Sequence, residues 1–561
     1  MNALFLNVHK NNKGSALVIS LIILVVVLLI GGAALKMANT ETHISASDVA
    51  AKQAFQAAEA ASAYEASMLR NYLATSLAFT PPIATINSSI SEPTLTGHTI
   101  VETSPIQAPS SPQQRNATGQ FNGLTAFTQD FRIETTARAN NGRASVKLVR
   151  VVQDQLIPLF QFGVFYQNLL EIFPGANMTF TGRVHSNANI RLGATATASL
   201  IVNQNMTAGG TITTYQPGTY HGETFSGPVS VTSQTQGIPQ LALPIPETAD
   251  PIQMIQRCTD PAQCSPSGNE NYRLMSKSGL RIIDGVAYNK NNQVVDLSSC
   301  GSNNPIESDG SFYDRRESKY VSSTQINLSK LQNCSAAYNA LNDPPAGGDA
   351  GILYVSNTQE GTDLDAVRIT NGANLNNTTA LPYGLMVATD NPLYIQGDFN
   401  TTPNPVTGHP VPVALASDAM TILSGSWNST TDTNSKTYKD DLTKRIANNY
   451  PEGDPRRTTT VNAAILTGNV PSTDETGVNY SGGLENFPRF LENWTSKELE
   501  YGGSMVCLWQ SQRATGRWAY GSPRYTAPIR DWSYNMDPLN MPPGTPRVRN
   551  LQRVQWYQAK S

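Results

Sequence analysis

The sequence predicts an α+β protein that is mainly β and begins with one long helix. Three observations lead to this fold class. An uncharged apolar stretch near the start is followed by a helical pattern of apolar residues. The rest of the chain consists largely of short apolar runs separated by turn residues, which is typical of strands. Only 14% of the 561 residues are charged, whereas Gly (41) and Pro (35) are frequent, as in turn-rich β proteins.

The apolar stretch covers residues 16–35 and contains no charge. Its length suffices for one helical crossing of a bilayer. Lys10 and Lys13 precede it, and basic residues favour the cytoplasmic side of a membrane. A secretory signal would have a shorter apolar core followed by a small-residue cleavage site. We therefore expect a single-pass membrane segment with a cytoplasmic N-terminus.

The helix is predicted to continue well beyond the membrane. No Gly or Pro occurs between Gly32 and Pro81. Mostly apolar side chains recur at spacings of three, four and seven, which places them on one helical stripe: Ile44, Ala51, Phe55, Ala58, Ser62, Leu69 and Leu73. We expect one helix over residues 15–78, with an apolar first half and an amphipathic second half. An ordinary single-pass anchor with a stalk is the alternative.

The N-terminus resembles that of type IV minor pilins of the PilX kind. The resemblance is carried by "KGSALVISLIILVVVLLIGG", which begins at Lys13, and by "AAKQAFQAAEAA", which begins at Ala50. In that family a basic leader ends in glycine, and a prepilin peptidase cuts there and methylates the new amine. The resemblance implies a leader of residues 1–14, cleavage after Gly14, and Ser15 as the first mature residue.

One position departs from the pattern of major pilins. Those proteins carry a glutamate at the fifth mature residue, where this chain has Ile19. A carboxylate in hydrocarbon is unfavourable unless it is paired. Major pilins pair this glutamate with the terminal amine of a neighbouring subunit. The departure favours a minor subunit, such as one at the filament tip, over a bulk filament subunit.

Residues 79–160 are expected to form a linker and a pilin-like β-hairpin. Residues 80–120 are rich in Pro, Ser, Thr and Gln, which predicts a linker or mobile loop. Two extended runs then flank Asn141 and Gly142, a strong hairpin signal because both turn positions need positive φ. The pilin resemblance implies that this hairpin packs on the exposed half of the N-terminal helix.

The remaining chain is predicted to contain two β regions separated by an insertion. Residues 161–247 and 349–561 carry short strand-like runs, which fit a β-solenoid or a β-sandwich. All six Trp residues lie in the second region. Residues 248–348 contain few apolar runs and are interpreted as an inserted loop region held by disulfides. Several segments of both β regions also resemble the large extracellular domains attached to PilX-like N-termini.

The five cysteines show no CxxC pair, so a structural zinc site is not expected. In an oxidising compartment we expect Cys258–Cys264 and Cys300–Cys334 to be disulfides, which leaves Cys507 unpaired. Sequence alone does not fix this connectivity, and buried free thiols are the alternative.

No catalytic motif stands out, and we expect neither an enzyme nor a cofactor or metal. Glycoside hydrolysis would need paired carboxylates, for which Asp390, Asp398 and Asp418 are the candidates, but Asp at turns usually bonds to backbone. His185 is interpreted as a structural histidine. Residues 432–441 are the best stretch for calcium, although they lack EF-hand spacing and a solvated loop is the default.

The last 61 residues have a formal charge of 8 − 2 = +6. This charge could form a face for an anionic glycan, DNA or a partner pilin, but we favour Arg side chains packed on Trp and Tyr rings. The basic residues are Arg513, Arg517, Arg524, Arg530, Arg547, Arg549, Arg553 and Lys560, against Asp531 and Asp537. The formal net charge of the whole chain is −3, so no nucleic-acid partner is predicted.

Two functions from different classes fit these observations. The first is a minor pilin, inserted in the inner membrane as a prepilin and assembled at or near the tip of an extracellular pilus, where it primes assembly. Its partners would be the prepilin peptidase and other minor and major pilins. The second is an adhesin that uses the same anchor to bind a surface or glycan ligand. A type II secretion pseudopilin is a variant of the first.

Overall fold

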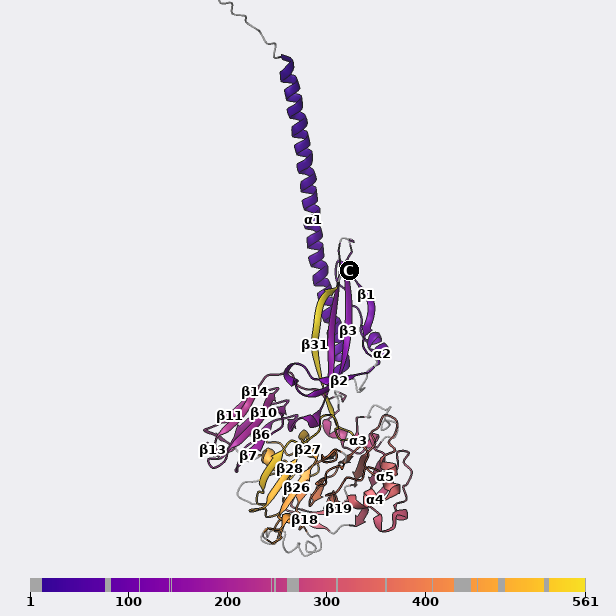
Figure 1. Cartoon of the computed structure of the whole chain (residues 1–561), viewed down its shortest axis with the longest axis vertical. Helices are drawn as coiled ribbons and strands as arrows, with labels where there is room; N and C mark the ends of the chain where they lie inside the picture. Colours follow the sequence, from indigo (N-terminus) through magenta and orange to yellow (C-terminus); the bar gives the residue numbers. More distant parts are fainter. Residues whose placement is uncertain are drawn as a thin grey trace, which may run out of the picture.

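The computed structural model describes residues 13–559, with gaps at 76–81, 110, 141, 143, 244, 247–248, 260–271, 309–310, 359–360, 406, 428–444, 452, 473–479 and 519–523. A long helix leaves one end of the molecule, and a large β domain forms the other end (Figure 1). Between them, an antiparallel sheet packs on the second half of the helix. We use the name N-terminal lobe for this sheet together with the part of the helix that the sheet covers. We use the name coil stack for residues 159–546.

Helix α1 (Lys13–Thr75) is continuous, as the sequence predicted, although residues 76–78 lie outside the described residues. Its stretch from Ser15 to Leu73 contains a window apolar enough to cross a membrane, and that window is not buried against other parts of the molecule. The predicted stripe becomes buried only where the sheet begins. Ile44 is 63% exposed, whereas Ala58, Leu69 and Leu73 are fully buried. The amphipathic half therefore serves as the core-facing side of the N-terminal lobe.

The sheet of the N-terminal lobe has the strand order β1-β3-β4-β31, with β2 paired to β3. Its strands are β1 (His98–Gln107), β2 (Gln113–Asn116), β3 (Thr125–Ala139), β4 (Ser145–Pro158) and β31 (Arg547–Ala559). Strands β3 and β4 pair antiparallel from Phe127↔Leu156 to Arg138↔Ser145, which confirms the predicted hairpin. Two apolar clusters between α1 and this sheet confirm that the hairpin packs on the helix.

The expected linker at residues 80–120 is wrong in its described part. These residues form α2 (Ile83–Ser89), β1 and β2. Strand β1 is an edge of the sheet, where Pro and Ser are tolerated because one side of the strand has no ladder partner. Composition alone therefore suggested a linker where the chain forms an edge strand.

The coil stack consists mainly of parallel strands in two large sheets. In spatial order, the first sheet contains β14 (Val229–Thr235), β10 (Leu200–Ala208), β8 (Val184–Ser186), β5 (Val164–Tyr166), β29 (Met505–Gln510), β27 (Ala464–Asn469), β24 (Val413–Ser417), β22 (Leu385–Thr389), β20 (Ile352–Ser356), β15 (Leu280–Ile283) and β16 (Val286–Tyr288), with β7 (Met178–Phe180) on β10. The second contains β17 (Ile306–Ser308), β19 (Lys319–Asn327), β21 (Leu364–Thr370), β23 (Leu393–Gln396) and β25 (Met420–Leu423), with β18 (Phe312–Asp314) on β19.

Smaller sheets and short helices complete the coil stack. The sheets are β11 (Ile212–Tyr215) with β9 (Ile190–Gly193) and β6 (Leu170–Ile172), β26 (Thr458–Asn462) with β28 (Glu498–Gly502) and β30 (Ile529–Ser533), and β12 (Gly218–Tyr220) with β13 (Glu223–Phe225). The α-helices are α3 (Leu274–Lys277), α4 (Leu328–Asn333) and α5 (Ser335–Leu341). The 3₁₀ helices of the whole chain are η1 (Gly119–Phe121), η2 (Leu159–Gln161), η3 (Pro251–Met254), η4 (Leu297–Asn303), η5 (Pro455–Arg457) and η6 (Leu484–Asn486).

The chain alternates between the two large sheets and thereby builds stacked coils. Strand β20 pairs in parallel with β22, and β22 pairs in the same way with β24. The intervening strands β21, β23 and β25 pair with one another in the second sheet. Side chains inside and across the coils are apolar, and all five residues of β22 are buried. Strands buried on both faces lose the alternating pattern that would identify them in sequence.

The order of the coils does not follow the chain. Strand β5, which lies near the start of the coil stack in the sequence, pairs in parallel with β29, which lies near its end. The chain runs outward from β5 to β14, and β15 resumes at the opposite end of the first sheet. The following coils then return toward β5. The two β regions predicted from sequence thus form one continuous sheet, joined at the β5–β29 seam.

The interpretation of residues 248–348 as an inserted loop region is wrong in its described part. These residues include β15, which pairs in parallel with β20, and β19, which pairs in parallel with β21. They therefore form the end of the coil stack, where α4 and α5 lie close to β19 and β15 (Figure 1). Polar turns and short strands concealed the strand pattern in the sequence.

Candidate functional site

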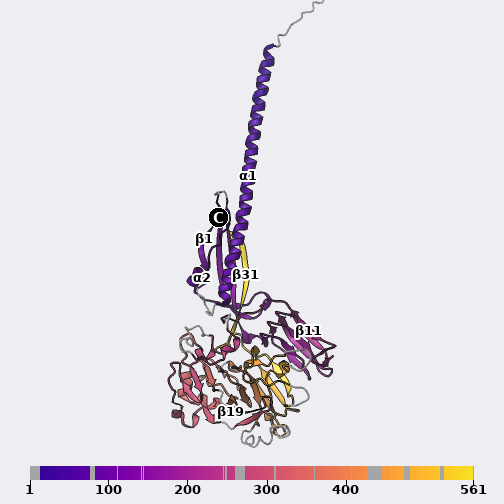
Figure 2. The same ribbon diagram turned by 180° about the vertical axis from the view of Figure 1, so that it is seen from behind.

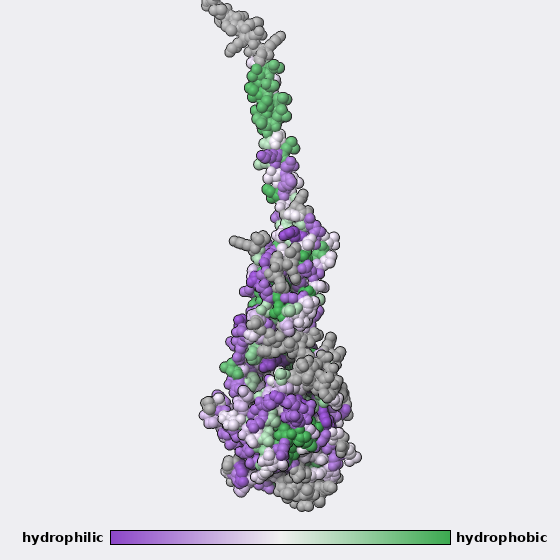
Figure 3. Space-filling view, turned by 90° about the vertical axis from the view of Figure 1, so that its right-hand side faces the viewer, coloured by the Kyte–Doolittle hydropathy of each residue, from purple (hydrophilic) through white to green (hydrophobic). Residues whose placement is uncertain are grey.

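The first part of α1 carries an uncovered apolar surface. Its large apolar side chains in residues 17–35 are between 45% (Val26) and 75% (Leu17) exposed. Figure 3 shows this surface as a continuous hydrophobic band at the end of the molecule remote from the coil stack. Such a surface is not stable in water and must be covered by lipid or by other apolar helices.

The predicted processing residues lie at the start of this helix. Gly14 and Ser15 fall in its first turn, and the side chain of Ile19 is 56% exposed on the apolar surface. No carboxylate occurs on α1 before Glu41. Ile19 is therefore one of the apolar side chains on the uncovered surface of this helix.

The second half of α1 is attached to the sheet by apolar and polar contacts. Glu65 is fully buried and accepts a hydrogen bond of 2.6 Å from the hydroxyl of Thr135 on β3. The ring of Phe55 packs edge-on against Trp556 of β31, with centroids 5.9 Å apart. The C-terminal strand thus contacts the same helix that begins the chain, which no local sequence pattern indicated.

Arg549 of β31 connects the two lobes. Its guanidinium donates to the carbonyl of Leu73 near the end of α1 and lies 3.0 Å from the carboxylate of Asp154 on β4. Its backbone N–H donates to the carbonyl of Ala242, which ends the outgoing part of the coil stack. Both charged side chains are 2% exposed. Burial raises the pKa of Asp154 to about 6, although Arg549 opposes that shift.

The three carboxylates considered for catalysis have structural partners. Asp418 accepts hydrogen bonds from the backbone N–H groups of Gln512, Arg513 and Ala514, at 2.6, 3.1 and 2.8 Å. Asp390 lies 2.8 Å from the guanidinium of Arg513. The structure thus brings these two carboxylates to the loop that follows β29. They hold this loop on the stack.

Asp398 lies apart from this pair. Its carboxylate accepts a hydrogen bond of 3.0 Å from the backbone N–H of Thr460, on a neighbouring coil. Among the described residues, no group of three or more His, Cys, Asp or Glu side chains could hold a metal ion. Residues 432–441, the calcium candidate, lie outside the described residues.

His185 is buried and has polar partners on both ring nitrogens. Nδ1 lies 2.8 Å from the hydroxyl of Thr207, and Nε2 lies 3.0 Å from Oδ1 of Asn187. Burial lowers its pKa to about 4. These contacts agree with a structural role for this histidine in the β5–β8 part of the stack.

The structure contains a buried acidic cluster that sequence reasoning missed. Glu171 on β6 accepts hydrogen bonds from Tyr220 at 2.5 Å, from Ser472 at 2.5 Å and from Ser481 at 2.8 Å, and it lies 3.1 Å from Nε2 of His221. Burial alone would raise the pKa of Glu171, but these hydrogen bonds lower it.

Glu485 lies near Glu171 and accepts a hydrogen bond from the backbone N–H of Phe173. Burial raises its pKa to about 7. Together the two carboxylates connect the region of β6 to Ser472, Ser481 and Glu485, some three hundred residues later. They stabilise the contact between the early and the late coils, and their separation in the sequence left no motif to find.

One predicted disulfide is present, and the other is only half described. Cys300 and Cys334 are bonded and tie η4 to the start of α5. Cys258 is buried, but its predicted partner Cys264 lies outside the described residues, so that pairing stays a prediction. Cys507 is a buried free thiol in β29, and burial raises its pKa.

The basic C-terminal residues do not form one open positive face. Several of them have aromatic or acidic partners: Arg530 lies over Trp532, Arg547 lies over Phe127, and Arg513 and Arg549 pair with Asp390 and Asp154. These contacts agree with the interpretation that the arginines pack within the β core. Lys560 lies outside the described residues.

Comparisons with known proteins identify the N-terminus. Residues 13–63 match the family model "PilX N-terminal". No curated protein matches the chain. A solved structure, the competence-associated pilin ComZ from Thermus thermophilus, matches over 90% of this chain and 97% of its own, with 12% identity and a TM-score of 0.27. That score is too low to show a common fold. The first helix thus matches the N-terminal segment of PilX-type pilins, and a large, mainly β C-terminal domain follows it.

Proposed function

We propose that this chain is a type IV minor pilin. It is cleaved after Gly14 and primes assembly at or near the tip of the pilus, where it displays the coil stack outside the cell. The observation that carries the proposal is the division of α1. Its first part is apolar and uncovered, whereas its second half is fixed in the N-terminal lobe. The same apolar surface fits the inner membrane before assembly and the helices of other pilins afterwards.

The position of the coil stack supports a place at the tip. It is wider than the N-terminal lobe and lies at the end opposite to the uncovered part of α1 in both views (Figures 1 and 2). Other pilins can therefore pack along α1 beneath it, whereas a subunit above it would meet the coil stack. Ile19 supports the same place, because it offers no carboxylate to the terminal amine of another subunit.

Processing is tested by the mass of the N-terminal peptide. Mature protein should begin at an N-methylated Ser15, and Gly14→Lys should leave the leader attached. Purified protein that retains Met1, or that begins beyond Leu35, would contradict the proposal. Ser20→Ala serves as the control, because it changes a small side chain inside the helix and leaves the cleavage junction intact.

The place in the filament is tested by labelling the coil stack on intact pili. Wild-type protein should be scarce and located at filament ends, and its deletion should lower the number of pili more than it alters their structure. Ile19→Glu should spread the label along the shaft. Abundant wild-type label along whole filaments would overturn the tip position.

An adhesin is the second candidate function, and a type II secretion pseudopilin is a variant of the first. A normal pilus count after deletion, together with lost surface binding, would favour the adhesin.

We further propose that the chain is not an enzyme, because Asp390 and Asp418 are engaged by a loop of the stack. Asp390→Asn, Asp398→Asn and Asp418→Asn should each leave pilus number and binding intact in protein that folds. Loss of a glycan-cleaving activity in one of these variants would instead support an enzymatic function.

A further inference from the structure

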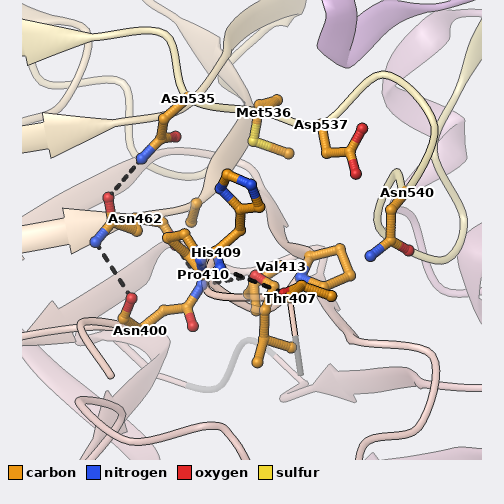
Figure 4. Close-up of a pocket in the computed structure, with 13 residues that line it drawn as sticks. Asn400, Thr407, His409, Pro410, Val413, Asn462, Asn535, Met536, Asp537 and Asn540 are labelled. Atoms are coloured by element: carbon orange, nitrogen blue, oxygen red, sulfur yellow. Dashed lines mark hydrogen bonds between the residues drawn. The ribbon is translucent and has the colours of Figure 1, made fainter. Parts of the chain in front are cut away.

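A polar recess lies on the coil stack where the loop between β23 and β24 meets residues 535–540, which follow β30. It is partly open to solvent. His409 and Thr407 line it from the loop, and Asn535, Asp537 and Asn540 line it from the later segment (Figure 4). Residues more than a hundred positions apart thus converge on one small site.

The floor of the recess is held by a ladder of asparagines from successive coils. Asn535 donates a hydrogen bond of 2.8 Å to Oδ1 of Asn462, and Asn462 donates one of 3.2 Å to the carbonyl of Asn400 (Figure 4). Asn400 is itself buried and donates to the carbonyls of Val411 and Asn462. A side chain at Gly502 would lie 2.2 Å from Nδ2 of Asn535, so the ladder depends on that glycine. A ligand would therefore meet a preorganised floor.

Several polar groups above this floor have no hydrogen-bond partner among the described residues. The ring nitrogens of His409, the side-chain amide of Asn540 and Oδ2 of Asp537 make no hydrogen bond with the described part of the chain. Met536 and Pro410 add apolar surface beside them. The recess therefore offers both donors and acceptors, together with an apolar wall, to a ligand.

A second recess shares Asn540 with the first. It has a volume of about 550 Å³ and is lined by both lobes, with Gln114 from the N-terminal lobe and Asp349 and Tyr383 from the coil stack. The side chain of Tyr383 is 62% exposed, so a ring face is available for stacking. Because Asn540 lines both recesses, an extended ligand could occupy them together.

The charges point to a neutral ligand. Among the described residues that line the first recess, Asp537 is the carboxylate and neither Lys nor Arg is present. The second recess has one charge of each sign, Asp349 and Arg547. An anionic ligand would meet no excess of positive charge in either place. Uncharged hydrogen-bonding groups beside an apolar face fit a sugar.

We propose that the two recesses form one binding site for a neutral saccharide chain. One sugar unit hydrogen-bonds to His409, Asp537 and Asn540 over the asparagine ladder, and a further unit stacks on Tyr383. The inference deepens the adhesin role and rests on the proposed display of the coil stack outside the cell. It assigns the ligand class and the residues that contact it.

The test is titration calorimetry with the full chain in detergent micelles. The probes are neutral tetrasaccharides of glucose, mannose and N-acetylglucosamine, and the monosaccharide of each. At least one tetrasaccharide should bind more tightly than its monosaccharide. Asn540→Ala should weaken its binding about tenfold or more, as expected for the loss of a ligand-contacting amide. Tyr383→Ala should weaken the binding of the tetrasaccharide and leave the affinity for the monosaccharide within about twofold of the wild type.

Asn291→Ala, at an exposed Asn in the turn after β16, is the matched control and should bind like the wild type. Thermal unfolding of each variant shows whether it folds, and exposed Tyr383 tests the site even if Asn540→Ala does not fold. The proposal is overturned if no neutral saccharide binds, if both site variants bind like the wild type, or if only a heparin tetrasaccharide or a Pro-rich peptide binds. Pilus number in these variants tests the assembly role separately, because neither residue lies on α1.

Discussion

The N-terminal lobe and the coil stack use different ways of joining distant parts of the chain. In the N-terminal lobe, long antiparallel strands cover one helix, and the final strand β31 pairs with β4 over residues 147–158. In the coil stack, short parallel strands pair mostly with strands of coils that are near in the sequence. One further pairing, the seam between β5 and β29, joins distant parts of the chain. The comparison indicates that the small lobe depends on the last residues of the chain, whereas the large domain depends on many similar contacts and one closing seam.

The largest effect on the difference between the two regions is expected from the removal of β31. A stop codon at Arg547 deletes the strand that pairs with β4, together with buried Val548 and Arg549. We expect the N-terminal lobe to lose its fold, because the sheet would expose a long buried edge. Limited proteolysis in detergent should then cut within β3 and β4. A stop codon at Lys560 is the control, and equal protease resistance of the two truncations would contradict the prediction.

The next largest effect is expected at the connection between the lobes. Arg549→Met removes one partner of a buried ion pair and leaves Asp154 without it. Such a change typically costs about 3–5 kcal/mol of unfolding free energy. Denaturant unfolding of the full chain should show this loss.

The same strand supplies the control for that measurement. Arg553→Met changes an exposed arginine and should have little effect. Adding Asp154→Asn to Arg549→Met should restore part of the stability, because the buried charge is then removed. If the double variant is no more stable than Arg549→Met, the ion pair is not the reason for the loss.

Within the coil stack, the disulfide at its end is expected to contribute somewhat less. Cys300 and Cys334 are separated by 34 positions, and closing a loop of that length contributes about 3–4 kcal/mol in the chain-entropy model. The double variant Cys300→Ser, Cys334→Ser should lose about this much on unfolding. Reduced wild-type protein should behave like the variant, and equal stability of all three proteins would show that the bridge does not constrain the unfolded chain.

The smallest effect concerns pH and the contact between early and late coils. The pKa of Glu485 is raised from 4.5 to about 7, so the folded state holds the proton more tightly than the unfolded chain. Its contribution is therefore fully present below pH 4.5 and is lost as pH rises through 7, which amounts to about 3 kcal/mol. The difference in stability between wild type and Glu485→Gln should change by this amount between pH 4 and 8.

If the difference in stability between wild type and Glu485→Gln stays constant with pH, the raised pKa of Glu485 is contradicted. Asp343→Asn, at a side chain that is 65% exposed, is the control and should follow the wild type. The comparison between variants matters because other carboxyl groups also titrate in this range, and the pKa of neighbouring Glu171 is shifted in the opposite direction.

Local patterns predicted the elements that depend on neighbouring residues. The helix from Lys13 follows from an unbroken apolar and amphipathic pattern, and the β3–β4 hairpin follows from two extended runs on either side of an Asn-Gly sequence. The bridge between Cys300 and Cys334 also joins residues of moderate separation. The predictions for residues 80–120 and 248–348 are wrong in their described parts, because strands at an edge or at the end of a stack can be polar and short.

The sequence by itself determined the membrane-length helix, the mainly β character and the pilin-like N-terminus, because each is written in consecutive residues. Three contacts follow only from the folded chain: β31 completes the sheet of the N-terminal lobe, β5 pairs with β29, and Glu171 lies near Glu485. The tertiary structure also decided that Asn400, Asn462 and Asn535 form one ladder. These pairs are far apart along the chain, and their contact energy is realised only when every coil between them has folded, so no local pattern encodes them.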